Sequence, residues 1–202
     1  MQHLLSKVER ILEISRELNA LQFGEFQLSS GAKSHYYFDG RLLTLHPEGA
    51  RAVAEVILPI TLDCGANFIA GPTLGADPIV SAVGLLSQIR GERLIPAGII
   101  RKEQKEHGTT RLIEGPVPPN AKVLVVDDTC TSGGSLFHAI NVLESENCEV
   151  VKVVSILDRR EGGYEKFQNS SYSYISLLEA DGYLIRPSAE FQSNPDGNFV
   201  AT

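Results

Sequence analysis

Cysteine is scarce in this chain of 202 residues, where Cys64, Cys130 and Cys148 stand far apart. Three scattered cysteines do not make a disulfide framework, and the absence of a C-x-x-C pair argues against a zinc site built from thiolates. The simplest interpretation is that all three are reduced thiols. The sequence therefore predicts a cytoplasmic protein.

Long hydrophobic runs are also missing. No apolar stretch of the sequence reaches the length that spans a bilayer. Residues 1–19 alternate charged residues with leucine and isoleucine and lack the apolar core of a signal peptide. We therefore expect neither secretion nor insertion into a membrane.

Basic residues are outnumbered, with 18 Lys and Arg against 25 Asp and Glu, so the formal net charge is −7. An acidic chain without a block of Lys or Arg is a poor candidate for binding nucleic acid or an anionic membrane surface. An anionic ligand would have to be held by a local basic cluster, by backbone N–H groups or by a metal.

The composition is otherwise that of a globular protein, with 43% hydrophobic and 21% charged residues. The length predicts a single domain over residues 1–202. Residues 1–19 have the spacing of an amphipathic helix, and two extended runs at 23–28 and 36–38 are typical of a small hairpin. The polar tail over 187–202 is expected to be partly disordered.

Strand and helix patterns alternate from residue 46 onward. The predicted helices cover 46–58 (ended by Pro59), 77–91 (capped by Asp77), 136–143 and 162–168, and the predicted strands cover 67–70, 94–100, 122–126, 150–157 and 172–177. Such alternation predicts an α/β fold with a mostly parallel central sheet flanked by helices.

The segment after the strand at 122–126 is the most informative part of the chain. It begins with Asp127 and Asp128, continues through small hydroxyl and glycine residues over 129–135, and leads into a helix. Backbone N–H groups in such a turn, with a helix N-terminus behind them, favour a phosphate. Neither G-x-x-x-x-G-K-[ST] nor G-x-G-x-x-G occurs, which argues against a P-loop nucleotidase and a Rossmann dehydrogenase. The plainer alternative is an ordinary strand-to-helix turn with a serine cap.

Four apolar residues, two acids and then Thr-x-Thr-x-Gly resemble the motif with which type I phosphoribosyltransferases bind 5-phosphoribosyl 1-pyrophosphate (PRPP). The resemblance implies the fold of that family, with a hood at about 20–45 and a PRPP-binding core at about 46–178. It also implies that Asp127 and Asp128 hold the ribose hydroxyls. The 5′-phosphate would be wrapped by Thr129, Cys130, Thr131, Ser132, Gly133, Gly134 and Ser135.

A second informative segment is basic. It places Arg101, Lys102, Lys105 and His107 within seven residues of an otherwise acidic protein. Cations aimed at a leaving pyrophosphate would stabilise its charge, and a mobile lid would exclude water from an activated sugar. The alternative is a solvated charged loop, since two glutamates are interleaved.

Three segments, at 26–39, 101–108 and 157–162, resemble the hood, the catalytic loop and the base-side segment of the orotate phosphoribosyltransferases. The resemblance implies transfer of the phosphoribosyl group to orotate, a homodimer in which loop 101–112 completes the neighbouring site, and Mg²⁺ held through PRPP without direct protein ligands. It implies that the catalytic residues are Arg101, Lys105, His107, Asp127 and Asp128. Lys102 is expected to bind PRPP.

The remaining candidates lie on either side of that motif. The loop over 71–77 matches the family's pyrophosphate loop, and Thr73 is its candidate side chain, although a plain turn into the next helix fits equally well. Arg159 suits a planar anionic base, and Thr131 matches a hydroxyl that contacts orotate in the family. Tyr37 and Phe38 form either an aromatic wall or hood core.

Two other functions stay open from the sequence. One is a phosphoribosyltransferase for another base, such as a purine or uracil, against which Arg159 argues. The other is a PRPP-sensing regulator, which would normally add a nucleic-acid-binding surface that this acidic chain does not show. Ser29 occupies a hood position where many relatives of the orotate enzymes have lysine.

Overall fold

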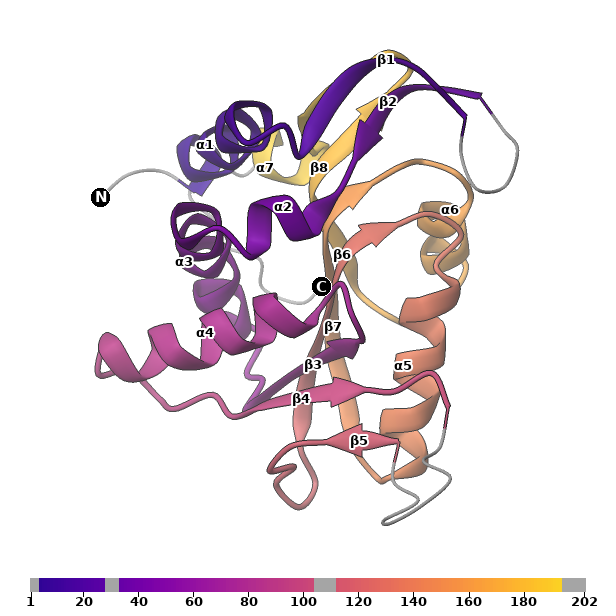
Figure 1. Cartoon of the computed structure of the whole chain (residues 1–202). Coiled ribbons are helices and arrows are strands. Elements are labelled where there is room, and N and C mark those ends of the chain that lie inside the picture. The colour runs from indigo at the N-terminus through magenta and orange to yellow at the C-terminus, as the bar shows by residue number, and fades with distance from the viewer. Residues whose placement is uncertain (1–3, 28–32, 104–111, 194–202) are drawn as a thin grey trace.

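The computed structural model describes residues 4–27, 33–103 and 112–193, and its centre is a seven-stranded sheet in the order β5-β4-β3-β6-β7-β8-β9 (Figure 1). Strands β4, β3, β6, β7 and β8 are parallel, and β5 and β9 pair antiparallel at the two edges. The strands are β3 (Phe68–Pro72), β4 (Ala97–Ile100), β5 (Ile113–Glu114), β6 (Lys122–Cys130), β7 (Glu149–Asp158), β8 (Tyr174–Asp181) and β9 (Leu184–Pro187). The predicted α/β fold is confirmed.

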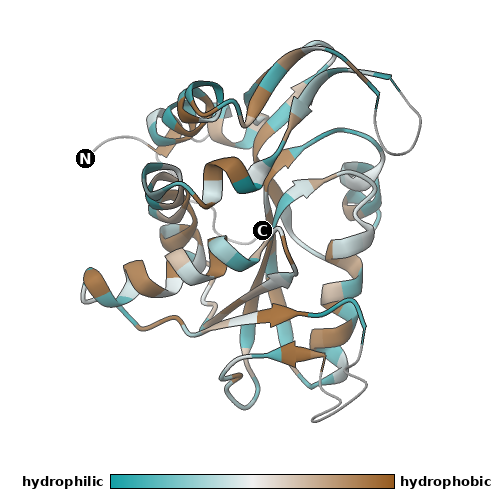
Figure 2. Cartoon of the chain, in the orientation of Figure 1, coloured by the Kyte–Doolittle hydropathy of each residue, from teal (hydrophilic) through white to brown (hydrophobic). Residues whose placement is uncertain are grey.

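Helices cover both faces of this sheet, which explains the uninterrupted apolar runs of its strands. In β6, Leu124 and Val126 belong to one core cluster, while Val123 and Val125 belong to the other. The first cluster includes α1 (Leu4–Glu17), α3 (Pro47–Asp63) and α4 (Asp77–Ile89), and the second includes α5 (Gly134–Ser145) and α6 (Gly163–Gln168). Figure 2 shows hydrophobic residues on the strands and on the helices packed against them.

The hood is a two-stranded antiparallel hairpin of β1 (Leu21–Gln27) and β2 (Lys33–Phe38), followed by the short helix α2 (Gly40–Thr44). Asp39 caps α2, because its side chain accepts a hydrogen bond from the backbone N–H of Arg41. The rings of His35 and Tyr183 lie 4.2 Å apart between centroids, so β2 contacts the turn between β8 and β9. The predicted hairpin is present, and it leads directly into the site described below.

The predicted end of the helix at residue 58 is wrong. Helix α3 continues to Asp63 with Pro59 inside it. The residues on either side of the proline, Leu58 and Ile60, are almost completely buried. Packing of this face against the core therefore outweighs the hydrogen bond that a proline removes.

The predicted end of the strand at residue 126 is also wrong, because β6 runs on through the acidic pair to Cys130. Its neighbour β7 extends equally far and supplies the ladder partners, with Asp127 opposite Ser155 and Cys130 opposite Asp158. The two aspartates therefore stand on a paired strand and not in a free loop. This fixes their backbone more firmly than the sequence suggests.

The chain beyond β8 has more structure than the sequence predicts. The strand expected at 172–177 is not the last, since β9 pairs with β8 along the edge of the sheet. Helix α7 (Ala189–Ser193) follows, and its Phe191 is fully buried in the main core. Residues 194–202 lie outside the described part of the chain. No helix in the described part is long and apolar enough to cross a membrane.

Candidate active site

A cavity of about 580 Å³ opens at the carboxyl ends of β3 and β6, the edge at which open α/β sheets bind ligands. Four parts of the chain meet there: the end of the hood, the loop after β3, Lys102 just after β4, and the junction of β6 with α5. The lining residues are Tyr37, Phe38, Asp39, Gly40, Arg41, Pro72, Thr73, Leu74, Gly75, Lys102, Asp127, Asp128, Thr129 and Ser135.

The two aspartates at the centre of this cavity differ in their surroundings. Asp127 is 6% exposed, and its carboxylate accepts hydrogen bonds from Ser135 Oγ (2.8 Å) and from the backbone N–H of Asp128 (2.9 Å). Burial, together with the charge of Asp128, raises the pKa of Asp127 to about 8. Burial also raises the pKa of Asp128, and this rise is opposed by the hydrogen bond with Asp127 and by the charge of Arg41.

Two glycines from different elements allow the backbone to approach Asp128 closely. A Cβ atom on Gly75 would lie 2.5 Å from Asp128 Oδ1 and 2.6 Å from Asp127 Oδ1. A Cβ atom on Gly40 would lie 2.6 Å from the Cβ of Asp128. Any larger residue would displace the carboxylates or the loops, so glycine is required at both positions.

The turn from β6 into α5 has the backbone form expected of an anion-binding loop. Gly133 precedes α5 with a φ of 75°, a left-handed conformation that glycine adopts without strain. Thr131, Ser132, Gly134 and Ser135 are exposed around it, with the N-terminus of α5 behind them. Only Ser135 of these four lines the cavity itself.

The start of α6 packs against this turn and is hydrogen-bonded to it. The backbone N–H of Gly163 donates a hydrogen bond to the carbonyl oxygen of Thr131 (2.9 Å). A Cβ on Gly163 would lie 2.4 Å from Cys130 Sγ, so this packing also needs glycine. Cys130 is 1% exposed, and burial raises the pKa of its thiol to about 11. Its side chain therefore belongs to the core under the turn.

Comparisons with known proteins show which family the chain belongs to. The family model described as the phosphoribosyl transferase domain matches residues 47–182. The chain belongs to the phosphoribosyltransferase family. It is 45% identical over 170 residues to the orotate phosphoribosyltransferase of Nostoc sp., covering 84% of this chain and 81% of that one. It is 41% identical to the orotate phosphoribosyltransferase of Synechocystis sp., covering 86% of this chain and 87% of that one.

Solved structures of phosphoribosyltransferases resemble the whole fold. The orotate phosphoribosyltransferase of Mycobacterium tuberculosis in complex with PRPP matches with a TM-score of 0.69 and 31% identity, covering 86% of this chain and 96% of that one. A phosphoribosyltransferase from Corynebacterium diphtheriae matches with a TM-score of 0.72 and 32% identity over the same shares. The predicted type I phosphoribosyltransferase fold is thereby confirmed.

Thr73, the candidate residue of the pyrophosphate loop in this phosphoribosyltransferase, is hydrogen-bonded to the first residue of α4. Thr73 lines the cavity, and its hydroxyl donates a hydrogen bond to Asp77 Oδ2 (2.9 Å). Asp77 was expected to cap α4, but the cap position is Ala76, and Asp77 is the first helical residue. Its carboxylate positions Thr73 instead.

The basic loop is described only at its start. Lys102 lines the cavity, whereas Arg101 lies 3.7 Å from Glu114 in an ion pair and donates a hydrogen bond to the carbonyl oxygen of Glu103. The predicted residues Lys105 and His107 fall within 104–111, which lies outside the described residues. Ser29 of the hood falls within 28–32, which also lies outside them.

The candidates for the base lie on both sides of β2. Tyr37 is exposed and Phe38 is buried, yet both line the cavity because they stand where the strand ends. The guanidinium of Arg159 lies 5.3 Å from the ring centroid of Tyr36, and its Nε donates a hydrogen bond to Glu161 Oε1 (2.9 Å). Arg159 and Thr131 do not line the cavity with the aspartates.

Sequence reasoning missed a cation of the phosphoribosyltransferase site. Arg41 lines the cavity, and its guanidinium forms a two-pronged pair with Asp39 at 3.0 and 3.1 Å. This pairing lowers the pKa of Asp39. The signal in the sequence is Asp-Gly-Arg at 39–41, directly after β2 and within the range predicted to form the hood.

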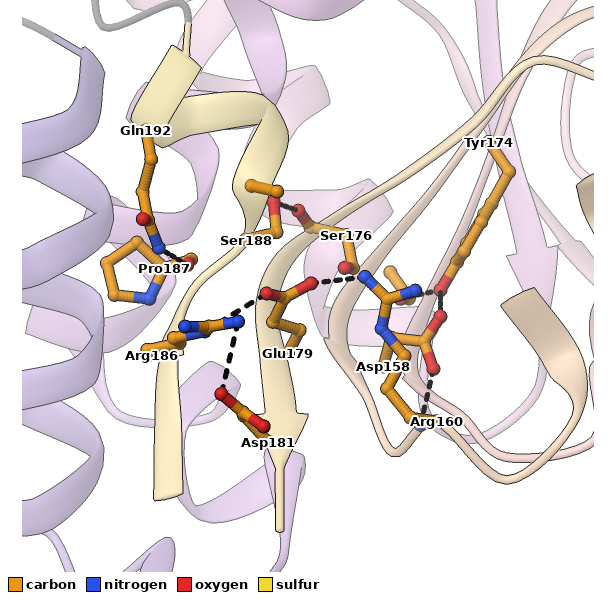
Figure 3. Close-up of polar contacts among 12 residues, drawn as sticks. Asp158, Arg160, Tyr174, Ser176, Glu179, Asp181, Arg186, Pro187, Ser188 and Gln192 are labelled. Atoms are coloured by element: carbon orange, nitrogen blue, oxygen red, sulfur yellow. Dashed lines mark hydrogen bonds and ion pairs between the residues drawn. The ribbon is translucent and has the colours of Figure 1, made fainter. Parts of the chain in front are cut away.

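The neighbouring arginines 159 and 160 have different partners, as Figure 3 shows for Arg160. The Arg160 guanidinium pairs with the buried Glu179 on β8, which also accepts a hydrogen bond from Arg186. Asp158 accepts hydrogen bonds from the backbone N–H of Arg160 (2.7 Å) and from the hydroxyl of Tyr174 (2.9 Å). This network holds the turn after β7 and leaves Arg159 directed toward the hood.

Proposed function

We propose that this phosphoribosyltransferase transfers the phosphoribosyl group of PRPP to orotate, giving orotidine 5′-monophosphate and pyrophosphate in de novo pyrimidine biosynthesis. The observation that carries the proposal is the similarity, at 45% and 41% identity over most of the chain, to proteins named orotate phosphoribosyltransferase. The cavity supports it, because an acidic pair, a phosphate-type turn and cations meet at one sheet edge.

Asp127 and Asp128 accept hydrogen bonds from the ribose hydroxyls, and the turn at 129–135 binds the 5′-phosphate through backbone N–H groups at the N-terminus of α5. Orotate N1 attacks C1 of PRPP with inversion, the bond between C1 and the pyrophosphate oxygen breaks, and the N1 proton is released to solvent. Positive charge develops on the ribose as pyrophosphate leaves. Catalysis is then mainly positioning and charge stabilisation. Arg101, Lys102, Lys105 and His107 stabilise the leaving pyrophosphate, together with Thr73.

The donor set of the cavity fits a magnesium ion that arrives with its substrate. In the described residues no group of three or more His, Cys, Asp or Glu side chains is arranged to hold a metal by itself. Mg²⁺ would be held through the pyrophosphate and ribose oxygens of PRPP, without direct protein ligands, and would neutralise part of the pyrophosphate charge.

We also propose a homodimer in which loop 101–112 completes the neighbouring site. An apolar groove of about 680 Å³ runs between α3 and α4. On its rim Leu85 is 63% exposed and Ile89 is 69% exposed. Exposed apolar patches of this kind mark protein interfaces, and a second copy would cover this one.

The three free thiols support a cytoplasmic location.

The test mixes the purified protein with PRPP, Mg²⁺ and orotate and follows the loss of orotate absorbance. Adenine, hypoxanthine and uracil are assayed in parallel. We expect turnover with orotate alone. Turnover with another base would contradict the proposed substrate, and PRPP binding without turnover of any base would indicate a PRPP sensor.

A further inference from the structure

The lining of the cavity has few cations for the most highly charged part of PRPP. Three acidic side chains line it, whereas Arg41 and Lys102 are the only basic ones among the described lining residues. The loop over 73–75 reads Thr-Leu-Gly and adds no cation. Because a pyrophosphate carries several negative charges and would lie near carboxylates, each cation of the lining matters for holding it.

Arg41 is held in place by one carboxylate and still has donors for a ligand. Its Nε donates a hydrogen bond to Asp39 Oδ1 (3.0 Å) and its Nη2 donates one to Asp39 Oδ2 (3.1 Å), which fixes the plane of the guanidinium. Both bonds use the Nε–Nη2 edge of a group with five N–H donors. The two N–H groups of Nη1 are therefore available to an anion in the cavity.

Two close approaches place Arg41 beside the proposed ribose site. Gly40, its neighbour in α2, packs against the Cβ of Asp128, and Gly75 packs against the carboxylate of the same residue. The charge of Arg41 also acts on that carboxylate. The start of α2 and the loop over 73–75 therefore flank the residue proposed to hold ribose hydroxyls. In PRPP the pyrophosphate is attached at C1, next to the carbon that bears the 2′-hydroxyl, so it leaves the ribose on this side of the site.

We propose that Arg41 is a pyrophosphate-binding residue, whose Nη1 donates hydrogen bonds to pyrophosphate oxygens of PRPP while Asp39 keeps the guanidinium at the cavity. The inference rests on the PRPP-binding part of the proposed function and deepens it. It gives Asp39 two roles, since its carboxylate caps α2 and orients Arg41. It also makes Arg41 a residue that distinguishes PRPP from ribose 5-phosphate, because only PRPP carries the pyrophosphate.

The decisive variant is Arg41→Met, which removes the guanidinium and keeps an unbranched side chain. The cap of α2 is retained, because Asp39 accepts its hydrogen bond from the backbone N–H of residue 41. Calorimetric titration with Mg²⁺ measures the binding of PRPP, pyrophosphate and ribose 5-phosphate. The Kd values for PRPP and pyrophosphate should rise about tenfold or more, and the Kd for ribose 5-phosphate should stay within about twofold.

A second variant, Arg41→Lys, separates the charge from the shape of the side chain. It keeps the positive charge and loses the planar fork that pairs with Asp39. Its Kd for pyrophosphate should fall between those of the unaltered protein and Arg41→Met. A Kd for Arg41→Lys as high as that of Arg41→Met would also fit the inference, since the orientation given by Asp39 is then lost.

The matched control is Arg186→Met. The side chain of Arg186 is 49% exposed, as is that of Arg41, and it pairs with Glu179 and Asp181 outside the cavity. This variant should bind all three ligands as the unaltered protein does. Equal PRPP binding by Arg41→Met and the unaltered protein would overturn the inference. An equal loss for ribose 5-phosphate would overturn it too, because Arg41 would then act on the ribose through Asp128.

Failure of the proposed function gives a different result. If the unaltered protein binds PRPP but does not turn over orotate, the orotate proposal fails, and the same titrations still decide the role of Arg41. If the unaltered protein binds neither PRPP nor pyrophosphate, the inference is overturned together with the PRPP site.

Discussion

Asp127 shows how a single residue of this site is tuned by its place in the fold. It is buried at the end of a central strand, next to a second carboxylate, and these surroundings raise its pKa from 3.8 to about 8. In the unfolded chain the same side chain releases its proton near pH 4. The folded state therefore binds more protons than the unfolded state between about pH 4 and pH 8.

A pH dependence of stability follows from this difference. Without ligand, the free energy of unfolding should decrease as the pH rises from 5 to 8, because the unfolded state gains from ionising Asp127 and the folded state does not. In Asp127→Asn that decrease should be smaller. Urea unfolding of both proteins at pH 5 and pH 8 measures it, and the same decrease in both would contradict the shifted pKa.

The sequence predicted the acidic pair but not the difference between its members. Adjacent aspartates after an apolar strand indicate a ligand site, yet nothing in the pattern shows that Asp127 accepts a hydrogen bond from Ser135. Nor does it show that Arg41 lies beside Asp128. The first contact depends on how the turn between β6 and α5 closes over eight residues, and the second joins segments that are far apart in the chain.

At the scale of elements, the order of strands and helices was predictable because each has a clear apolar period. Their ends were less so. Pro59 is tolerated inside α3 because both flanking side chains are buried, and β6 continues past Val126 because β7 offers ladder partners. The polar sequence after β9 does not predict α7, which packs on the main core through the buried Phe191. Packing decides each of these cases, and local propensity does not.

The loop after β3 provides the clearest prediction at this scale. In Gly75→Ala the new methyl group would lie within 2.6 Å of both carboxylates, so the loop or the aspartates must move. PRPP binding should weaken by about tenfold or more. Gly24→Ala, whose methyl group meets a Phe26 ring carbon at 3.4 Å, is the matched control. Calorimetry should detect weakened binding for the first variant alone, and unchanged binding in Gly75→Ala would refute the packing argument.

At the scale of the whole molecule, the groove between α3 and α4 predicts the dimer interface. Leu85→Glu and Ile89→Glu place charges on exposed positions, so the fold should be retained while association is lost. Light scattering should report a monomer, and turnover should fall because loop 101–112 no longer reaches a neighbouring site. A variant that stays dimeric, or an unaltered protein that is monomeric and fully active, would contradict this part of the account.

The central claim is that the cavity at the carboxyl ends of β3 and β6 holds PRPP through its acidic pair. The most direct test is calorimetric titration of PRPP with Mg²⁺ into the unaltered protein, Asp128→Asn and the control Asp181→Asn, whose carboxylate pairs with Arg186 at the sheet edge. We predict that Asp128→Asn weakens PRPP binding by about tenfold or more, because charge-assisted hydrogen bonds to the ribose are lost, and that the control binds as the unaltered protein does. Equal binding by all three proteins would contradict the account.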